Sequence, residues 1–154
     1  YADILDENSG TVDVFPCRKL TAIPNIDASE FPDLVPIISL VASISNGTTV
    51  IYNAERLRYK ESDRLASTCH VLKALGANIT ETEDKLIIVG TKALHGAYEG
   101  DGYGDHRIIM MLAVSSLVTA GTVKIHEASA ASKSFPNFFE VLHKLGLDGN
   151  IELV

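Results

Sequence analysis

The sequence predicts an α/β domain built from a repeated β-α-β-α-β-β unit, with helices packed against sheets. Two observations carry this prediction. Apolar residues recur alternately with the helical period of about 3.6 and the strand period of 2. Segments of similar sequence also recur in the same order about 72 residues apart, as in Val71–Gly76 and Val141–Gly146. We therefore expect one domain over residues 1–154 with an internal repeat, whose copies cover about 11–81 and 85–154.

Four segments predict helices. Pro36 falls in the first turn of the first helix, where proline is tolerated. Ser62 is the candidate cap of the second helix, and Gly76 ends it. The third segment is apolar nearly all round, as in a buried helix, and the fourth runs from a candidate cap at Ser134 to Gly146. The helix-forming positions are Leu34, Ile37, Val41 and Ile44; Leu65, Cys69, Leu72 and Leu75; residues 105–120; and Phe135, Phe138, Leu142 and Leu145, with these last four directed inward.

Strands are predicted between these helices, where the period of the apolar residues is 2. The glycine-rich stretch 98–104 predicts a mobile loop instead. It is a poor phosphate loop, because Asp101 and Asp105 would repel an anion. The predicted strands cover about 11–17, 48–53, 77–81, 85–89, 122–127 and 150–154.

The composition is that of a globular protein. A chain of 154 residues, 46% hydrophobic and 21% charged, can bury one core. Its net charge of −7 argues against nucleic acid or a membrane surface as a partner, and no apolar run approaches the ~20 residues of a membrane span. Cys17 and Cys69 show no pairing pattern, which suits a reducing, cytoplasmic setting, and no metal site is expected. Because the chain opens at Tyr1 rather than Met, we expect a segment of a longer protein.

Charged residues gather at the predicted helix starts. Carboxylates such as those of Asp63 and Asp105 have a structural explanation there, because they cap free N–H groups and complement the helix dipole. Arg64 and Arg107 differ, since a cation in the first turn costs about 0.3–1 kcal/mol unless something offsets it. The offset is either a bound anion or an ion pair with the neighbouring Asp63 or Asp105. The repeat places both arginines at equivalent positions, which favours the anion.

Four more residues accompany these arginines. Lys60 and Lys133 end equivalent loops before the second and fourth helices, and as a pair they favour binding of phosphate or carboxylate, although a lone loop lysine is usually only solvated. Glu61 is a candidate acid or base because neighbouring charges shift a carboxyl pKa. His106 either donates to an anion or satisfies a buried polar group.

Four motifs occur in a fixed order along the chain. They are Phe31-Pro-Asp-Leu followed by Gly47-Thr-Thr, Leu57-Arg-Tyr-Lys-Glu-Ser-Asp-Arg-Leu65, Gly104-Asp-His-Arg-Ile-Ile-Met110 and Ser132-Lys-Ser-Phe-Pro136. Together they resemble the C-terminal part of the EPSP (5-enolpyruvylshikimate-3-phosphate) synthase family, from about residue 20 to the end. The resemblance implies the enolpyruvyl transferase fold, in which two similar domains are built from such repeated units and this chain forms part of one domain.

The resemblance also implies an activity. Family members transfer the enolpyruvyl group of phosphoenolpyruvate to the 5-hydroxyl of shikimate 3-phosphate and release phosphate, a step of the shikimate pathway to aromatic amino acids. The reaction is an addition–elimination without metal or organic cofactor.

Individual residues of this chain match the family's functional positions. Asp33 matches the base near the 5-hydroxyl, Lys60 the lysine that contacts this hydroxyl, and Glu61 the acid. The phosphoenolpyruvate ligands match Arg64, Arg107 and Lys133, with His106 beside them. Lys133 is also a candidate for protonating the methylene carbon.

Two departures and two alternatives accompany the resemblance. Some members carry asparagine where this chain has Arg56, so the role of Arg56 stays open. Members are far longer, so we expect this piece to need the family's N-terminal domain as its partner and to be inactive alone. A UDP-N-acetylglucosamine enolpyruvyl transferase and a non-catalytic anion-binding module are the alternatives. The motifs Lys60–Arg64 and Lys133–Pro136 favour the shikimate enzyme over the amino-sugar enzyme.

Overall fold

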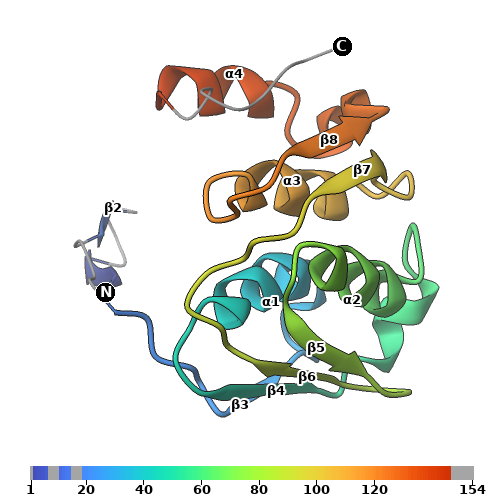
Figure 1. The fold of residues 1–154 in the computed structure, drawn as a ribbon. Helices are drawn as coiled ribbons and strands as arrows, with labels where there is room; N and C mark the ends of the chain where they lie inside the picture. Colours follow the sequence, from blue (N-terminus) through green and yellow to red (C-terminus); the bar gives the residue numbers. More distant parts are fainter. Residues whose placement is uncertain (1, 7–10, 15–18, 147–154) are drawn as a thin grey trace.

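A four-stranded sheet lies at one end of the molecule (Figure 1). The computed structural model describes residues 2–6, 11–14 and 19–146. The strand order is β3-β4-β6-β5, in which β3 and β4 run parallel and the other neighbours antiparallel. The strands are β3 (Asn25–Asp27), β4 (Thr48–Tyr52), β5 (Asn78–Glu81) and β6 (Leu86–Val89).

Helices α1 (Val35–Ser43) and α2 (Arg64–Ala74) cover one face of this sheet, and α3 (His106–Ser115) packs against both helices (Figure 1). Beyond α3 lie the parallel pair β7 (Tyr98–Asp101) and β8 (Val123–His126) and then α4 (Phe138–Lys144). The remaining elements are the antiparallel strands β1 (Ala2–Asp6) and β2 (Thr11–Val14) and the 3₁₀ helices η1 (Pro32–Leu34), η2 (Glu55–Tyr59) and η3 (Ala128–Lys133).

The order β3-α1-β4-α2 recurs as β7-α3-β8-α4, but the strands that open the two copies differ from the prediction. The first copy opens with β3, because the described part of the strand predicted over 11–17, which is β2 (Thr11–Val14), pairs with β1 instead. The strand predicted over 85–89 is present as β6 in the first sheet, so the second copy opens with β7. The prediction of a mobile loop over 98–104 is therefore wrong for its first four residues. The strand predicted over 150–154 lies outside the described residues.

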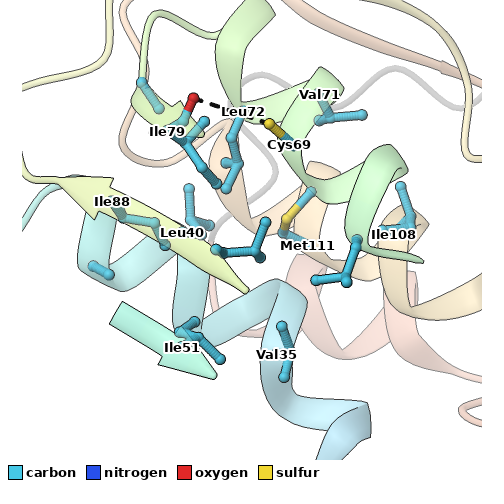
Figure 2. Close-up of a cluster of buried hydrophobic side chains, with 14 of the residues drawn as sticks. Val35, Leu40, Ile51, Cys69, Val71, Leu72, Ile79, Ile88, Ile108 and Met111 are labelled. Carbon is cyan, nitrogen blue, oxygen red and sulfur yellow. Dashed lines mark hydrogen bonds between the residues drawn. The ribbon is translucent and has the colours of Figure 1, made fainter. Parts of the chain in front are cut away.

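The core lies between the first sheet and the three packed helices (Figure 2). The predicted apolar face of α2 is buried as expected: Leu65, Leu72 and Leu75 are inaccessible, and the Cys69 thiol contacts the Ile79 carbonyl. Burying each leucine contributes about 1.5–3 kcal/mol. In α1 the buried positions include Ser39 and Ser43, whose hydroxyls donate to backbone carbonyls four residues earlier.

Two helix starts differ from the predicted ones. The cap of α2 is Asp63, whose Oδ1 accepts the Ala66 N–H at 3.0 Å, and not Ser62. Helix α4 begins only at Phe138, because η3 and the segment through Pro136 occupy the preceding positions. Ser134 is thus no cap, and the predicted inward face is half right: Phe138 and Leu142 are buried, whereas Phe135 and Leu145 are exposed.

Gly96 and Gly121 allow close backbone contacts between the end of α2 and the segments that precede β7 and β8. A Cβ on Gly96 would lie 2.0 Å from the Ala74 carbonyl oxygen at the end of α2, and a Cβ on Gly121 would lie 2.0 Å from the Gly96 carbonyl oxygen. Thr119 Oγ1 also donates to the Gly96 carbonyl at 2.8 Å. Three backbone segments therefore touch at a place that admits no side chain, which fixes α3 and β8 relative to α2. We call this contact the glycine seam.

Within the described parts of the chain, no helix has the length and apolarity that a bilayer crossing requires.

Candidate active site at the helix starts

Asp33 is the meeting point of three cations that are distant in the sequence. Its carboxylate oxygen Oδ1 lies 2.8 Å from Arg64 Nη1 and 3.6 Å from Lys60 Nζ, and Oδ2 lies 3.2 Å from Arg107 Nη2. Helix η1 carries Asp33, the start of α2 carries Arg64, and the start of α3 carries Arg107. The structure thus brings together the predicted site residues of the first three helix starts.

Arg64 is buried at the centre of this group, with 1% of its side chain exposed. Nε donates to Asp105 Oδ2 at 2.8 Å and Nη2 to Asp105 Oδ1 at 3.2 Å. Nη1 donates to Asp33 at 2.8 Å, and Nη2 also donates to Glu61 Oε2 at 2.6 Å. Four of the five N–H groups of the guanidinium are therefore satisfied by carboxylates. Arg64 orients the acidic residues around it, and one N–H of its guanidinium makes no hydrogen bond to these carboxylates.

The ion pairs of Arg64 with Asp63 and of Arg107 with Asp105, which were the structural alternatives to a bound anion, do not form. Asp63 pairs with Arg58 rather than Arg64, at 2.8 Å. Asp105 receives the Arg107 backbone N–H at 2.9 Å as the cap of α3, whereas the Arg107 side chain reaches Asp33. Asp105 thus fulfils the predicted capping role and also neutralises the buried Arg64.

The three most tightly paired groups have shifted pKa values. Burial raises the pKa of the Asp105 carboxyl, but the Arg64 guanidinium and the Arg107 N–H outweigh burial, so the pKa lies below its ordinary value. At Asp33, partial burial is likewise outweighed by the hydrogen bond from Arg64 and by the charges of Lys60 and Arg107, so its pKa is lowered. Burial lowers the pKa of Arg64, but Asp105 more than compensates and raises it. Both carboxylates are therefore held ionised.

Glu61 and His106 lie beside Arg64. Glu61 Oε1 is 3.7 Å from His106 Nδ1, which is too long for a hydrogen bond. His106 is buried, and its Nδ1 atom has no hydrogen-bond partner among the described residues. A buried polar atom without a partner is costly, so this nitrogen is available to a ligand, a water or a reoriented Glu61.

Lys133 reaches the same region from the far end of the chain. Its Nζ donates to the Gly104 carbonyl at 3.1 Å, immediately before Asp105 and the start of α3. Helix η3, whose last residue is Lys133, packs against α3 and holds the lysine there. Lys133 therefore lies next to the α3 start, without an ion pair of its own to Asp33.

Of the four predicted site cations, Lys60, Arg107 and Lys133 are exposed or partly exposed, whereas Arg64 is buried. The side chains of Lys60 and Arg107 are 34% and 30% exposed, and Arg107 Nε has no hydrogen-bond partner within the described part of the chain. Guanidinium and ammonium donors on separate elements suit a small anion that carries phosphate and carboxylate groups. In contrast, a groove of about 660 Å³ between β3 and α1 is mostly apolar and its charged lining residues are Asp27 and Glu30, so it does not suit such an anion.

Sequence reasoning missed two residues that hold this site together. Ser62 donates to Asp105 Oδ2 at 3.1 Å, although its position suggested a helix cap. Arg58 binds the cap residue Asp63, and its place within a motif rich in charged residues was the available signal. Among the residues that the structure describes, no cluster of histidine, cysteine and acidic side chains offers a metal site.

Comparison with curated proteins finds close relatives. The chain is 48% identical over 121 residues to 3-phosphoshikimate 1-carboxyvinyltransferase of Clostridium botulinum (strain Alaska E43 / Type E3), covering 79% of this chain and 28% of that protein. It is 46% identical over 149 residues to the protein of the same name from Clostridium acetobutylicum, covering 95% of this chain and 35% of the relative. The chain thus spans about a third of the length of these relatives.

Solved structures agree with the sequence relatives. EPSP synthase from Acinetobacter baumannii superimposes with a TM-score of 0.73 at 31% identity, over 82% of this chain and 31% of that chain. The enolpyruvyl transferase NikO from Streptomyces tendae gives the same TM-score at 21% identity, over 88% of this chain and 30% of that chain, which shows a shared fold. The family model of EPSP synthase (3-phosphoshikimate 1-carboxyvinyltransferase) matches residues 2–142. The family match, these relatives and the repeated α/β fold agree, and the chain belongs to the EPSP synthase family.

Proposed function

We propose that this chain supplies the phosphoenolpyruvate side of an EPSP synthase active site. The complete enzyme transfers the enolpyruvyl group of phosphoenolpyruvate to the 5-hydroxyl of shikimate 3-phosphate and releases phosphate. The main observation in support of this proposal is that Lys60, Arg64 and Arg107 all contact the carboxylate of Asp33. Family membership supports the choice of reaction. The remaining two thirds of the relatives' length is the partner that completes the site.

The accessible cations bind the anionic substrate. Arg107 and Lys133 bind the phosphate and carboxylate of phosphoenolpyruvate, and the remaining N–H of Arg64 adds a third donor. Several fixed cations orient the substrate and stabilise the charge that develops during addition. His106 Nδ1, which lacks a partner among the described residues, is a further donor or acceptor at the same place.

The addition step needs a base and an acid. As the 5-hydroxyl oxygen bonds to C2 of phosphoenolpyruvate, its proton passes to Asp33, beside Lys60, and the methylene carbon gains a proton from Glu61 or Lys133. In the elimination, the C2–O bond to phosphate breaks and phosphate leaves, the methyl group returns one proton to the group that donated it, and the C=C bond of the enol ether forms. Arg64 contacts both Asp33 and Glu61, so one guanidinium sets the distance between the two proton-transfer groups.

Phosphate release by the full-length polypeptide that carries this chain tests the proposal. We expect Arg107→Gln to lower kcat/KM for phosphoenolpyruvate by about 10–100-fold, since a charge-assisted hydrogen bond contributes about 1.5–3 kcal/mol. The control is Lys85→Gln, which removes an exposed cation that pairs with Asp84 rather than with a site residue and should leave kcat/KM unchanged. We expect Asp33→Ala and Glu61→Gln to abolish most turnover.

The alternatives give different results in the same assay. Phosphate release with UDP-N-acetylglucosamine in place of shikimate 3-phosphate would assign the amino-sugar reaction. Intact turnover in Asp33→Ala and Glu61→Gln would show that the chain is a non-catalytic module. We expect no turnover from the isolated chain, and a rate of about 1 s⁻¹ or more would contradict this expectation.

We also infer a cytoplasmic location. The buried free thiol of Cys69 is compatible with the reducing compartment that the cysteine content suggested. Fractionation of cells that express the full-length protein checks this inference, and recovery of the protein outside the cytoplasm would contradict it.

A further inference from the structure

Arg58 holds both ends of the segment that carries Lys60 and Glu61. It lies in η2, two residues before Lys60, and its Nη1 donates to both oxygens of Asp63 at 3.1 and 2.8 Å. This contact joins positions 58 and 63, so the residues between them form a loop closed by an ion pair. None of the predicted site residues is among the hydrogen-bond partners of Arg58.

The other donors of Arg58 bind the turn between β5 and β6. Nε donates to the Glu83 carbonyl at 2.9 Å, and Nη2 donates to Glu81 Oε2 at 3.1 Å and to the Thr82 carbonyl. Backbone carbonyls have fixed positions in this turn, because the Thr82 N–H donates to the Lys85 carbonyl at 2.9 Å. The guanidinium therefore ties η2, the start of α2 and the first sheet to one another.

The closed loop makes its other side-chain contacts inside the candidate site. Lys60 reaches Asp33, Glu61 reaches Arg64 and His106, and Ser62 reaches Asp105. All of these partners belong to the candidate site itself, whereas Glu81, Thr82 and Glu83, which Arg58 binds, lie outside it. Arg58 supplies an anchor to the scaffold that does not depend on the substrate.

We propose that Arg58 is a positioning residue, which sets the place of Lys60 and Glu61 by clamping their loop to the β5–β6 turn and to the cap of α2. The proposal rests on the proposed function, in which these two side chains take part in the addition step. A lysine at position 58 keeps the charge but not the planar fork that satisfies five contacts at once. A displacement of a catalytic side chain by about 1 Å can lower turnover by up to about 100-fold.

The test compares Arg58→Lys with wild type in the full-length polypeptide. We expect kcat for phosphate release to fall by about 10–100-fold, while KM for phosphoenolpyruvate changes by less than about threefold, because Arg107 and Lys133 come from other elements. In a Glu61→Gln background the same substitution should lower kcat by a smaller factor than in wild type, because one of the two positioned groups is already lost. Lys85→Gln, in the same turn, is the matched control.

Amide hydrogen exchange provides a second readout that does not require turnover. Exchange at residues 59–62 should be faster in Arg58→Lys and in Glu81→Ala, while the buried middle of α2 is unaffected. Unchanged exchange at 59–62, unchanged kcat, or a full additive loss in the Glu61→Gln background would each overturn the proposal. A wild-type protein that releases no phosphate from the two substrates would refute the proposed function, and the exchange result alone would then decide the role of Arg58.

Discussion

A buried arginine surrounded by carboxylates is the most consequential residue in the site. Arg64 is 1% exposed, and Asp105, its principal partner, is inaccessible. An isolated charge of this kind would be prohibitively costly to bury, so each member of the pair depends on the other. The pair also explains why an arginine is acceptable in the first turn of α2, where the helix dipole disfavours it.

Replacing Asp105 by asparagine should therefore destabilise the chain strongly. We expect Asp105→Asn to lower the free energy of unfolding by about 3–5 kcal/mol, because Arg64 loses its buried counter-charge. Urea unfolding measures this difference. Asp84→Asn is the control: its carboxylate is exposed and lies 4.0 Å from Lys85, so a change within about 0.5 kcal/mol is expected. Equal effects of the two substitutions would contradict the assigned role of Asp105.

The same carboxylate predicts a dependence of stability on pH. The pKa of Asp105 is lower in the folded chain than its ordinary value of 3.8, so the unfolded chain takes up a proton first as the pH falls. The contribution to stability is complete above pH 3.8 and is lost as the pH falls through the folded pKa. In Asp105→Asn, the dependence of the unfolding free energy on pH below 5 should be shallower, by at most about 1.4 kcal/mol per pH unit. Urea titrations between pH 3 and 6 test this, and parallel profiles would contradict it.

Individual site residues were easier to predict than their partners. The repeat drew attention to Arg64 and Arg107, and the unfavourable position of a cation at a helix start explained why they were unusual. Their partners lie elsewhere: Asp105 is 41 residues from Arg64, and Asp33 is 74 residues from Arg107. Such pairings follow from the packing of α1, α2 and α3 against one another, which local sequence does not encode.

At the scale of elements, helix α2 was predicted well, and β4, β5, β6 and β8 lie within one residue of the predicted strand ranges, whereas β3 and β7 were not predicted as strands. Helix α2 has four apolar positions at helical spacing, and the structure buries them all. In contrast, β3 has three residues and β7 contains Gly100, so neither shows a strand period. Both become strands by pairing in parallel with β4 and β8, and this pairing is a tertiary effect.

The start of α2 offers a test of capping. Asp63→Ala should lower the free energy of unfolding by about 1 kcal/mol, since the Ala66 N–H loses its acceptor. The matched control is Asn137→Ala at the start of α4, where the cap residue makes no side-chain cap hydrogen bond. We expect the control to change stability by less than about 0.5 kcal/mol. Urea unfolding of both variants gives the comparison, and a larger loss in Asn137→Ala would disprove this account of the two caps.

At the scale of the whole molecule, the glycine seam determines how α3 is placed against α2. Arg64 begins α2 and Arg107 lies in the first turn of α3, so we expect a shift of α3 against α2 at the seam to change the distance between the two arginines. A side chain at the seam must push backbone segments apart, since no flexible atom can yield there.

Gly121→Ala tests this relation. The added methyl group would lie 2.0 Å from the Gly96 carbonyl oxygen, so we expect a loss of about 1–3 kcal/mol in the free energy of unfolding. In the full-length polypeptide, kcat/KM for phosphoenolpyruvate should fall as well. Gly146→Asn is the control, because no atom of the described part of the chain lies within 4 Å of a Cβ added there and asparagine tolerates its positive φ of 70°. Unchanged stability in Gly121→Ala would show that the seam can relax.

The ion pairs around Asp33 have a final consequence for charge balance. With Glu61 ionised, the three cations Lys60, Arg64 and Arg107 balance the three carboxylates of Asp33, Glu61 and Asp105, so this cluster is then electrically neutral before any ligand arrives. Lys133 adds a single positive charge nearby, and the chain as a whole carries a net charge of −7. A substrate with two or more negative charges would therefore leave the cluster with excess negative charge. Under the proposed function, we expect the compensating cations to come from the rest of the longer enzyme, so that electrostatics would make substrate affinity depend on its presence.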